Sequence, residues 1–323
     1  MFKKVIEDFR RGSNFYKISE DMNSTILEEY YLIFDEKIVR SGKVQSLITD
    51  YDSNGIPLNR SYIDVDNKNL IYYPITIGQV GLSVFHTYLK SKTNEDLNRF
   101  LKFADWYVDN GIEDKKLGIR WLTDVPLPGY KNPGPWQSAF SQSRAISILL
   151  RAHQQTQNFK YLETAKKALI SFSFPVSEGG VVSNTKWGPF FEEYPAEVPV
   201  LVLNGHIFSL FGLLDFNRAF QENKECGELV KNGFKTLISS LSDFDMGYWS
   251  RYNYCEASFY PKVDPATISY HRLHIMLLKA VNRFQEHPIL GRTIETWESY
   301  IGFWNYLRAS ILKYRALKKL NRI

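Results

Sequence analysis

Apolar residues recur at three- and four-residue spacing from about residue 74 onward, which is the period of amphipathic helices. Ile146, Leu149 and Leu150 illustrate this spacing. The pattern predicts four consecutive pairs of helices, at residues 75–92 with 94–111, 137–156 with 159–173, 203–220 with 224–241, and 268–285 with 289–319.

The first predicted helix of each pair begins with a cluster of polar residues. The clusters contain Gln79, Gln142, Asn204 and Tyr270, at intervals of 63, 62 and 66 residues. A recurring unit of this length is typical of stacked helical hairpins. We therefore predict a mainly α fold, an incomplete (α/α) toroid of about four helical hairpins in residues 71–323. The polar helix starts are expected to converge at one end of the ring.

The first 70 residues follow a different pattern. Short β-leaning runs at 30–34, 43–48 and 61–65 are separated by turn-forming residues such as Asp52-Ser53-Asn54-Gly55. This pattern predicts a separate small region of extended segments and β-hairpins, residues 1–70, which packs on the helices.

Composition favours a carbohydrate partner. Aromatic residues make up 15% of the 323 residues, including 20 Tyr and 7 Trp, and aromatic faces stack well on sugars. The net charge of +5 favours an acidic partner slightly, but no nucleic-acid-binding motif or dense basic tract is present. We expect an acidic polysaccharide or oligosaccharide substrate and no nucleic acid.

Neither a metal nor another cofactor is expected. Cys226 and Cys255 do not have a metal-ligand spacing, and His271 and His274 lack a third ligand at a convincing distance in sequence. No secretory leader and no run of about 18 apolar residues are seen, so the chain is expected to be cytoplasmic without an integral membrane segment. The basic residues 313–322 are expected on the exposed face of a last helix. Peripheral membrane association and a homodimer through this helix are further expectations.

One segment combines chemical groups that are suited to proton transfer. Phe191-Glu192-Glu193-Tyr194-Pro195 places carboxylates beside a phenol, shortly before the apolar helix that follows Val202-Leu203-Asn204-Gly205. An acidic residue that only interacts favourably with the helix dipole would explain part of this pattern. Proton chemistry on a sugar would explain all of it.

Four sequence blocks together resemble the C-terminal helical domain of the D-glucuronyl C5-epimerases. They occur in the family's order and span about three quarters of the chain: Tyr72-Tyr73-Pro74-Ile75-Thr76-Ile77-Gly78-Gln79-Val80-Gly81-Leu82-Ser83, Ser141-Gln142-Ser143-Arg144-Ala145-Ile146-Ser147, Glu192-Glu193-Tyr194-Pro195 with Val202-Leu203-Asn204-Gly205, and Tyr270-His271 with His274. The Glu-Glu-Tyr-Pro block with its Leu-Asn-Gly is the most specific of the four.

The resemblance implies an isomerase that inverts C5 of D-glucuronate to give L-iduronate in heparan-type polymers. It also implies a β-rich N-terminal part followed by an (α/α) barrel. The family's catalytic Glu-Tyr pair falls on Glu193 and Tyr194, and its last tyrosine on Tyr270. Its remaining tyrosine lies in a Tyr-x-x-Arg pattern that fits Tyr248 to Arg251. The chain departs from the family because most of the large β-barrel region of the animal enzymes is missing.

Epimerisation removes a proton α to a carboxylate and returns one to the opposite face of the ring. The carboxylate must be neutralised as negative charge develops, and Arg144 and Arg251 are the candidates. Two acid/base groups must reach C5 from opposite faces. Glu193 and Tyr270 lie on different predicted hairpins and suit these roles. A tyrosine acting as base needs a neighbouring cation, for which Arg251 or His271 is expected.

Further substrate contacts are expected from Gln142, Asn204 and His271 at the polar helix starts. Trp187 lies in a predicted loop and is expected to stack on a sugar. The same is plausible for Trp121, Trp136 and Trp249, which lie in loops or at the ends of predicted elements. Trp297 and Trp304 are seven residues apart, which predicts core positions on a helix. The alternative interpretation of Tyr248 and of Tyr252 to Tyr254 is that they are strand residues without a catalytic role.

Three alternatives remain open from the residues alone. A polysaccharide lyase shares the first proton abstraction but then eliminates across C4 and C5 of the uronate. A glycoside hydrolase would need two carboxylates about 5–10 Å apart across the scissile bond. A non-catalytic glycan-binding toroid would need neither a proton-abstracting group nor a pair of catalytic carboxylates.

Overall fold

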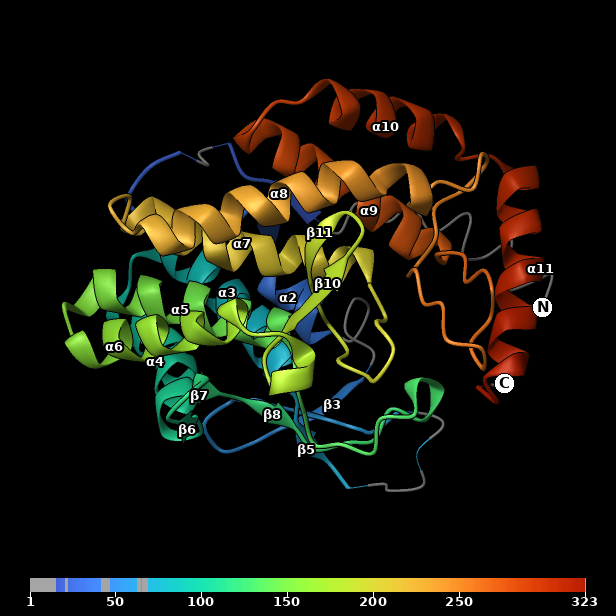
Figure 1. Ribbon diagram of the computed structural model, residues 1–323. Helices are drawn as coiled ribbons and strands as arrows, with labels where there is room; N and C mark the ends of the chain where they lie inside the picture. Colours follow the sequence, from blue (N-terminus) through green and yellow to red (C-terminus); the bar gives the residue numbers. More distant parts are fainter. Residues whose placement is uncertain (1–15, 21–22, 42–46, 63–64, 66–68, 323) are drawn as a thin grey trace.

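Three helices form the centre of the computed structural model, which describes residues 16–20, 23–41, 47–62, 65 and 69–322 (Figure 1). They are α3 (Pro74–Ser91), α5 (Ala139–Thr156) and α7 (Leu203–Ala219). Each is buried on all sides over most of its length, from residues 74 to 86, 139 to 152 and 203 to 216. A helix that is buried all round lies in the interior of a protein.

A second helix packs on the outside of each central helix. α4 (Asn94–Asp109), α6 (Phe159–Leu169) and α8 (Lys224–Phe244) each follow a central helix and bury only one face. α9 (Ile268–Phe284) packs on α7 and is covered by α10 (Pro288–Ser299). The four predicted helical hairpins are therefore confirmed as α3 with α4, α5 with α6, α7 with α8, and α9 with α10.

The last predicted helix is wrong in one respect, because residues 289–319 are not continuous. The chain leaves α10 after Ser299 and begins α11 (Phe303–Lys319) after Gly302, whose extended backbone forms the N-cap. Of the two tryptophans predicted in the core, Trp297 is fully buried, but Trp304 is 78% exposed. The break explains the difference, since it ends the seven-residue helical relation between them.

The central helices contact one another in chain order, α3 with α5, α5 with α7 and α7 with α9. An antiparallel pair of short strands, β1 (Tyr16–Ile18) and β2 (Leu32–Phe34), lies between the ends of this row, because β1 contacts α9 and β2 contacts α3. The mainly helical class is therefore as predicted. Closure of the row into a toroid stays a prediction.

The N-terminal part contributes the remaining short elements before α3. They are α2 (Glu36–Arg40) and a three-stranded antiparallel sheet of β3 (Ile48–Tyr51), β4 (Pro57–Asn59) and β5 (Ile71–Tyr72). The β-leaning run at 30–34 contains β2. Much of the run at 43–48 and part of that at 61–65 lie outside the described residues.

The connections between hairpins carry three two-stranded antiparallel sheets and short 3-10 turns. The strands are β6 (Ile112–Asp114) with β7 (Gly118–Arg120), β8 (Leu122–Thr123) with β9 (Trp136–Gln137), and β10 (Val182–Thr185) with β11 (Gly188–Phe191). The turns are η1 (Pro128–Tyr130), η2 (Ile170–Ser173) and η3 (Val176–Glu178). β11 leads directly to Glu192 and Glu193.

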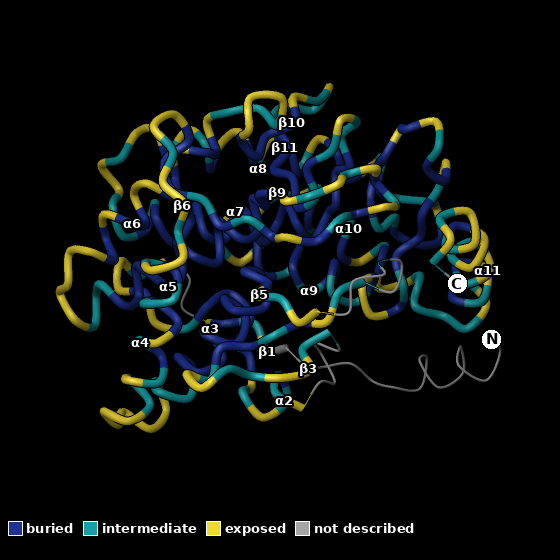
Figure 2. Tube along the Cα trace, turned by 90° about the horizontal axis from the view of Figure 1, so that it is seen from below, coloured by how far each residue is buried: buried dark blue, intermediate teal, exposed yellow. Residues whose placement is uncertain are grey.

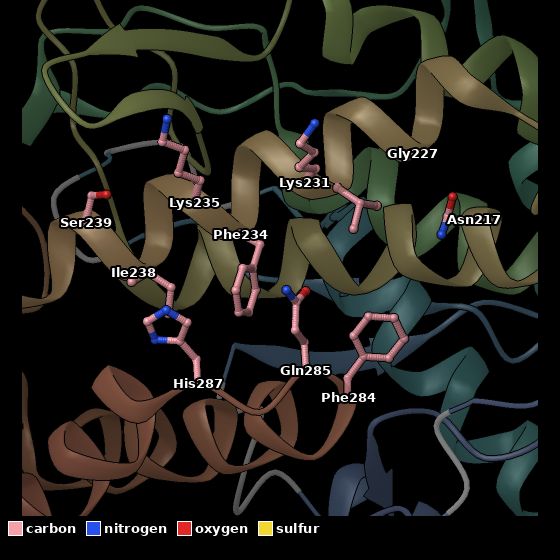
Figure 3. A pocket seen from close by; sticks show the side chains of 11 residues that line it. Asn217, Gly227, Lys231, Phe234, Lys235, Ile238, Ser239, Phe284, Gln285 and His287 are labelled. Atoms are coloured by element: carbon pink, nitrogen blue, oxygen red, sulfur yellow. The ribbon is translucent and has the colours of Figure 1, made fainter.

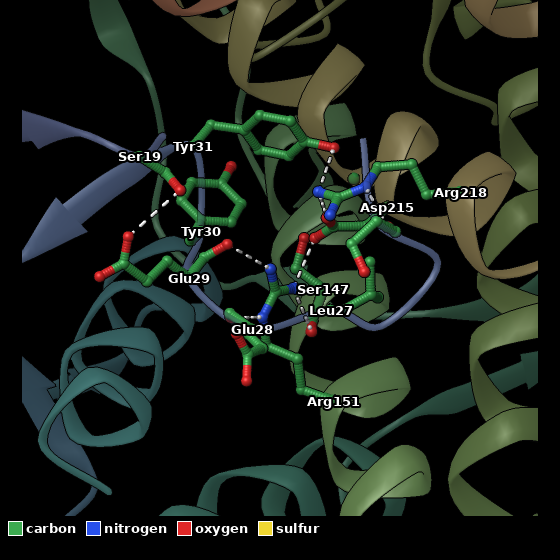
Figure 4. A network of polar contacts seen from close by, with 12 residues as sticks. Ser19, Leu27, Glu28, Glu29, Tyr30, Tyr31, Ser147, Arg151, Asp215 and Arg218 are labelled. Carbon is green, nitrogen blue, oxygen red and sulfur yellow. Dashed lines mark hydrogen bonds and ion pairs between the residues drawn. The ribbon is translucent and has the colours of Figure 1, made fainter. Parts of the chain in front are cut away.

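A buried ionic network attaches the N-terminal segment to α5 and α7 (Figure 4). Arg151 Nη1 lies 2.6 Å from Asp215 Oδ2, and both side chains are fully buried. Arg151 also donates to the carbonyls of Glu28 and Glu29, and Arg218 Nε donates to the carbonyl of Ser24. A buried ion pair of this kind is costly to break, because the remaining charge is left without its partner.

Candidate active site

Glu193 lies against the N-terminus of α7. A Cβ added at Gly205 would lie 2.5 Å from Glu193 Cβ and 2.6 Å from its Oε2, so only glycine allows this approach. Asn204 Nδ2 donates to Glu193 Oε2 at 3.2 Å. The Leu-Asn-Gly sequence thus seats the carboxyl at the helix end where negative charge is favoured.

The neighbouring Glu192 has a different environment. Its carboxylate accepts hydrogen bonds from the Ser183 hydroxyl at 2.7 Å and from the Val200 and Leu201 amides at 3.1 and 3.0 Å. Leu201 has φ 54, a left-handed conformation that is rare for a residue of this type. Glu192 therefore holds the loop before α7, which leaves Glu193 as the acid beside the phenols.

Four tyrosines from separate parts of the chain interact with Glu193, and a fifth contacts one of them; we call the five the phenol cluster: Tyr62, Tyr73, Tyr194, Tyr252 and Tyr270. Tyr194 hydrogen-bonds to Glu193 and interacts electrostatically with Tyr62, Tyr73 and Tyr252. The Tyr62 and Tyr73 hydroxyls are 2.5 Å apart, and the rings of Tyr252 and Tyr270 meet edge to face at 5.0 Å. The structure thus brings together the predicted residues Glu193 and Tyr194, and Tyr270 joins this group through its ring contact with Tyr252.

Burial changes the ionisation of these groups. It raises the pKa of Glu193 to about 7, while hydrogen bonds from Tyr194 and Asn204 partly oppose the rise. Burial, followed by the charge of Glu193, raises the pKa of Tyr194 and Tyr252 well above the usual value. Near neutral pH the Tyr194 and Tyr252 phenols are therefore neutral, beside a carboxyl that is close to half-protonated.

Backbone pairing places Tyr252 beside the start of α7. The Leu203 amide donates to the Tyr252 carbonyl at 3.3 Å, and the Tyr254 amide donates to the Leu201 carbonyl at 3.2 Å. Sequence reasoning assigned this segment to strand residues and did not single out Tyr252. No local motif distinguishes Tyr252 from the other tyrosines, because its place depends on pairing between distant segments.

Tyr248, the tyrosine indicated by the Tyr-x-x-Arg pattern, lies in a different environment. It packs with Trp249, Ile268 and Tyr306, and the Arg308 guanidinium lies 3.8 Å from its ring centroid. Within the described part of the chain, no contact given by the structure joins Tyr248 to Glu193. Its catalytic role stays a prediction, and Tyr252 is the tyrosine of this region that meets Glu193.

Two of the predicted substrate-binding residues are inside the fold. Arg144 is fully buried, and its guanidinium carbon lies 4.7–5.3 Å from the ring centroids of Tyr30, Phe34, Phe140 and Phe208. Gln142 Nε2 donates to the carbonyls of Ile119 and Ala168 at 2.9 and 3.1 Å. Both side chains hold neighbouring elements together in this structure.

His271 is also buried, and its ring stacks on Trp249 at 3.9 Å. Its two ring nitrogens lie within hydrogen-bonding distance of the Ser250 hydroxyl and the Trp297 carbonyl. Burial lowers the pKa of His271 to about 4, so the ring is neutral near pH 7. This environment argues against the cationic role expected for it from the sequence.

Trp187 and Arg251, two further residues predicted to bind substrate, lie in a second group of aromatic rings and cations. Trp187 contacts Tyr254 edge to face at 5.2 Å, and the Arg251 guanidinium lies 5.2 Å from the Tyr254 ring centroid. Lys186 Nζ lies 4.9 Å from the Trp187 ring centroid. Trp121, Trp136 and Trp249, the other tryptophans considered for stacking, are buried.

A surface groove of about 490 Å³ lies apart from these groups, between α8 and the turn from α9 to α10 (Figure 3). Lys231, Lys235 and His287 are among its lining residues, and none of the lining residues belongs to the phenol cluster. Among the described residues, no group of three or more His, Cys, Asp or Glu side chains is arranged to hold a metal ion. In the same part of the chain, no helix is long and apolar enough to span a bilayer.

Comparison with known proteins agrees with the sequence resemblance. The D-glucuronyl C5-epimerase of Caenorhabditis elegans is 27% identical over 237 residues, which cover 70% of this chain and 38% of that protein. An uncharacterized protein of Methanocaldococcus jannaschii is 27% identical over 197 residues, which cover 56% of this chain and 64% of that protein. The chain therefore spans less than two thirds of the length of either relative.

A family model described as the D-glucuronyl C5-epimerase C-terminus matches residues 114–299. This range includes Glu193, α7, Tyr252 and Tyr270, and it covers more than half of the chain. The chain belongs to the D-glucuronyl C5-epimerase C-terminal family.

Proposed function

We propose that the chain inverts C5 of D-glucuronate residues to L-iduronate in a uronic-acid-containing polysaccharide. The observation that carries the proposal is a buried carboxyl, Glu193, with a pKa of about 7 among neutral phenols from distant segments. A general acid/base works best when its pKa lies near the working pH. Such a group is suited both to take a proton from carbon and to return one.

The reaction breaks the C5–H bond and moves its electron pair toward the adjacent carboxylate of the sugar. One group takes the C5 proton, and a second group on the opposite ring face then delivers a proton to C5. Glu193 comes from the segment before α7, whereas Tyr252 and Tyr270 come from the segments before and within α9. We assign Glu193 to one face and Tyr252 or Tyr270 to the other, with Tyr194 orienting the sugar or relaying the proton.

The developing charge on the sugar carboxylate must be stabilised by donors. Neutral phenols such as Tyr194 and Tyr252 can donate hydrogen bonds to it, as can the amide of Asn204, and no reorganisation is then needed during the reaction. The Arg144 guanidinium lies among four aromatic rings, and burial keeps the His271 ring neutral near pH 7, so we assign the cationic role to Arg251. We assign Arg251, Tyr254 and Trp187 to an adjacent sugar of the acidic chain, through cation and ring-face contacts.

The proposal includes the toroidal arrangement of the four hairpins. Supporting it are the ordered contacts of α3, α5, α7 and α9 and the β1–β2 hairpin between the ends of this row. Such a ring would collect residues from different hairpins around one sugar.

The test is incubation of the protein with non-sulfated heparosan, followed by proton NMR of the sugar. Iduronate signals are expected with the wild-type chain and should be lost in Glu193→Gln and Tyr252→Phe. Wild-type protein that is folded and leaves every uronate polymer unchanged would contradict the proposal.

A uronate lyase is the second candidate, because a buried acid/base among phenols also suits its first step. The two reactions differ in the next step, because only the lyase expels the C4 substituent and leaves a double bond between C4 and C5. Ultraviolet absorbance that rises during incubation would identify the lyase, whereas an epimerase leaves the absorbance unchanged. A protein that binds the glycan but leaves it unaltered would instead be the non-catalytic binding module.

A further inference from the structure

α11 is a surface helix with an unusually exposed apolar side. It lies at one edge of the molecule (Figure 1), and most of its trace is exposed or intermediate (Figure 2). Of its 17 residues only Tyr306, Ala309 and Ala316 are buried. Trp304 is 78% exposed and Ile311 39% exposed. Single exposed apolar residues are ordinary, but these lie on one helix.

The net positive charge of the whole chain resides on this helix and the residues after it. Residues 303–323 contain six Lys or Arg and no Asp or Glu. The rest of the chain has 34 basic and 35 acidic residues, since the totals are 40 and 35. The positive charge is therefore local, and it coincides with the exposed apolar residues.

The two features meet in one groove of about 440 Å³ along α11. It is lined by Trp304, Leu307, Arg308, Ile311, Leu312 and Arg315. These positions follow the three- and four-residue spacing of a helix face, so one stripe carries four apolar side chains and two arginines. A basic amphipathic face with exposed tryptophan is the pattern of helices that lie in a membrane interface.

We propose that α11 binds the surface of a bilayer that contains anionic lipids. The basic residues suit the negative head groups, and Trp304, Leu307 and Ile311 suit the apolar boundary beneath them. A second copy of the chain is a poorer occupant, because two such grooves would bring Arg308 and Arg315 of one copy against the same arginines of the other. A soluble acidic glycan would use the charge but would leave the aliphatic side chains without a partner.

The position of α11 gives this binding a consequence for the proposed site. Lys313 Nζ pairs with Asp264 Oδ1 at 2.7 Å, and Lys319 Nζ donates to the Tyr260 carbonyl at 2.8 Å. The Tyr252 ring centroid lies 5.0 Å from Lys313 Nζ. A bilayer on the outer side of α11 would therefore hold the phenol cluster near the membrane. If the proposed epimerase activity holds, this position favours a uronate glycan that is still attached to a lipid.

The test is co-sedimentation of the full chain with vesicles of phosphatidylcholine, with and without phosphatidylglycerol. Each basic residue near an anionic surface contributes about 1 kcal/mol, so Arg315→Gln with Lys318→Gln should weaken partitioning by about 30-fold. The matched control, Lys231→Gln with Lys235→Gln, removes the same charge from the α8 groove and should bind as wild type. Wild-type tryptophan emission should shift to shorter wavelength on binding, and this shift should be smaller in Trp304→Phe.

Binding that requires phosphatidylglycerol and is lost only in the α11 variant would support the proposal. Absence of vesicle binding, or equal weakening in both double variants, would overturn it. Loss of heparosan binding in the α11 variant without any vesicle binding would assign the surface to glycan instead. Because the vesicle assay contains no sugar, its result does not depend on whether the chain is an epimerase.

Discussion

The raised pKa of Glu193 predicts a specific pH dependence of stability. Its carboxyl has a pKa of about 7 in the folded chain, against an ordinary value of 4.5. Between these values the folded chain retains a proton that the unfolded chain has released, so folding is progressively disfavoured as the pH rises from about 4.5 to 7. Below this window both states are protonated, and above it both are ionised.

Glu193→Gln should remove this contribution, because an amide mimics the protonated carboxyl and can still accept from Asn204. A pKa difference of about 2.5 is worth about 3 kcal/mol in the free energy of unfolding. The wild type should therefore lose about 3 kcal/mol relative to the variant as the pH rises from 4.5 to 7. The informative quantity is the difference in unfolding free energy between the wild type and Glu193→Gln at each pH, because other groups titrate in both proteins.

Urea unfolding followed by circular dichroism at fixed ionic strength would measure both curves. Glu192→Gln is the contrasting variant, since its amide would face a backbone N–H donor of Val200 or Leu201. Because burial also raises the pKa of Glu192 to about 7, Glu192→Gln should reduce the same pH dependence, but unlike Glu193→Gln it should lower stability below pH 4.5 as well. Parallel curves for the wild type and Glu193→Gln between pH 4.5 and 7 would refute the raised pKa and, with it, the acid/base role near neutral pH.

Three further predictions concern the site and its support. Tyr252→Phe should lower the rate of C5 proton exchange in a uronate by about 100-fold or more, whereas Tyr248→Phe should change it only a few-fold; the reverse order would restore the sequence assignment. Gly205→Ala should displace Glu193 and lower the exchange rate while costing about 1–3 kcal/mol in urea unfolding, and unchanged exchange would show that the close approach is dispensable. Asp215→Asn should cost about 3–5 kcal/mol in the same unfolding assay, because Arg151 loses its buried partner; a cost under 1 kcal/mol would contradict the anchoring role of this pair.

Sequence periodicity predicted the helices because their apolar stripes are local patterns. The pairs from α3 to α8 match the predicted ranges within a few residues. The break between α10 and α11 was missed, since Tyr300, Ile301 and Gly302 interrupt an otherwise continuous pattern only briefly. The exposure of Trp304 follows from that break, because α11 turns away from the helix that carries Trp297.

The candidate site was predictable where residues lie close together in the sequence. Glu193, Tyr194 and the Asn204-Gly205 pair form one local unit, and their proximity follows from the short loop before α7. Tyr252 was missed because its position depends on pairing with Leu203, about fifty residues earlier in the chain. Buried polar residues are equally hard to interpret from sequence.

Gln142 and Arg144 illustrate that difficulty. Both lie in a polar cluster at a helix start, and this placement alone cannot distinguish a sugar contact from a contact within the fold. The structure gives Gln142 two backbone carbonyls and surrounds Arg144 with four aromatic rings. Only the three-dimensional contacts separate these residues from Asn204, which reaches Glu193.

The central claim is that this chain exchanges the C5 proton of a uronate and returns it to either face. The most direct measurement is NMR of heparosan oligosaccharides incubated with the protein in D₂O. Deuterium at C5 in both glucuronate and newly formed iduronate is predicted for the wild type, with loss of both signals in Glu193→Gln. A folded wild-type protein that binds the oligosaccharides but leaves every C5 position protonated would contradict the account.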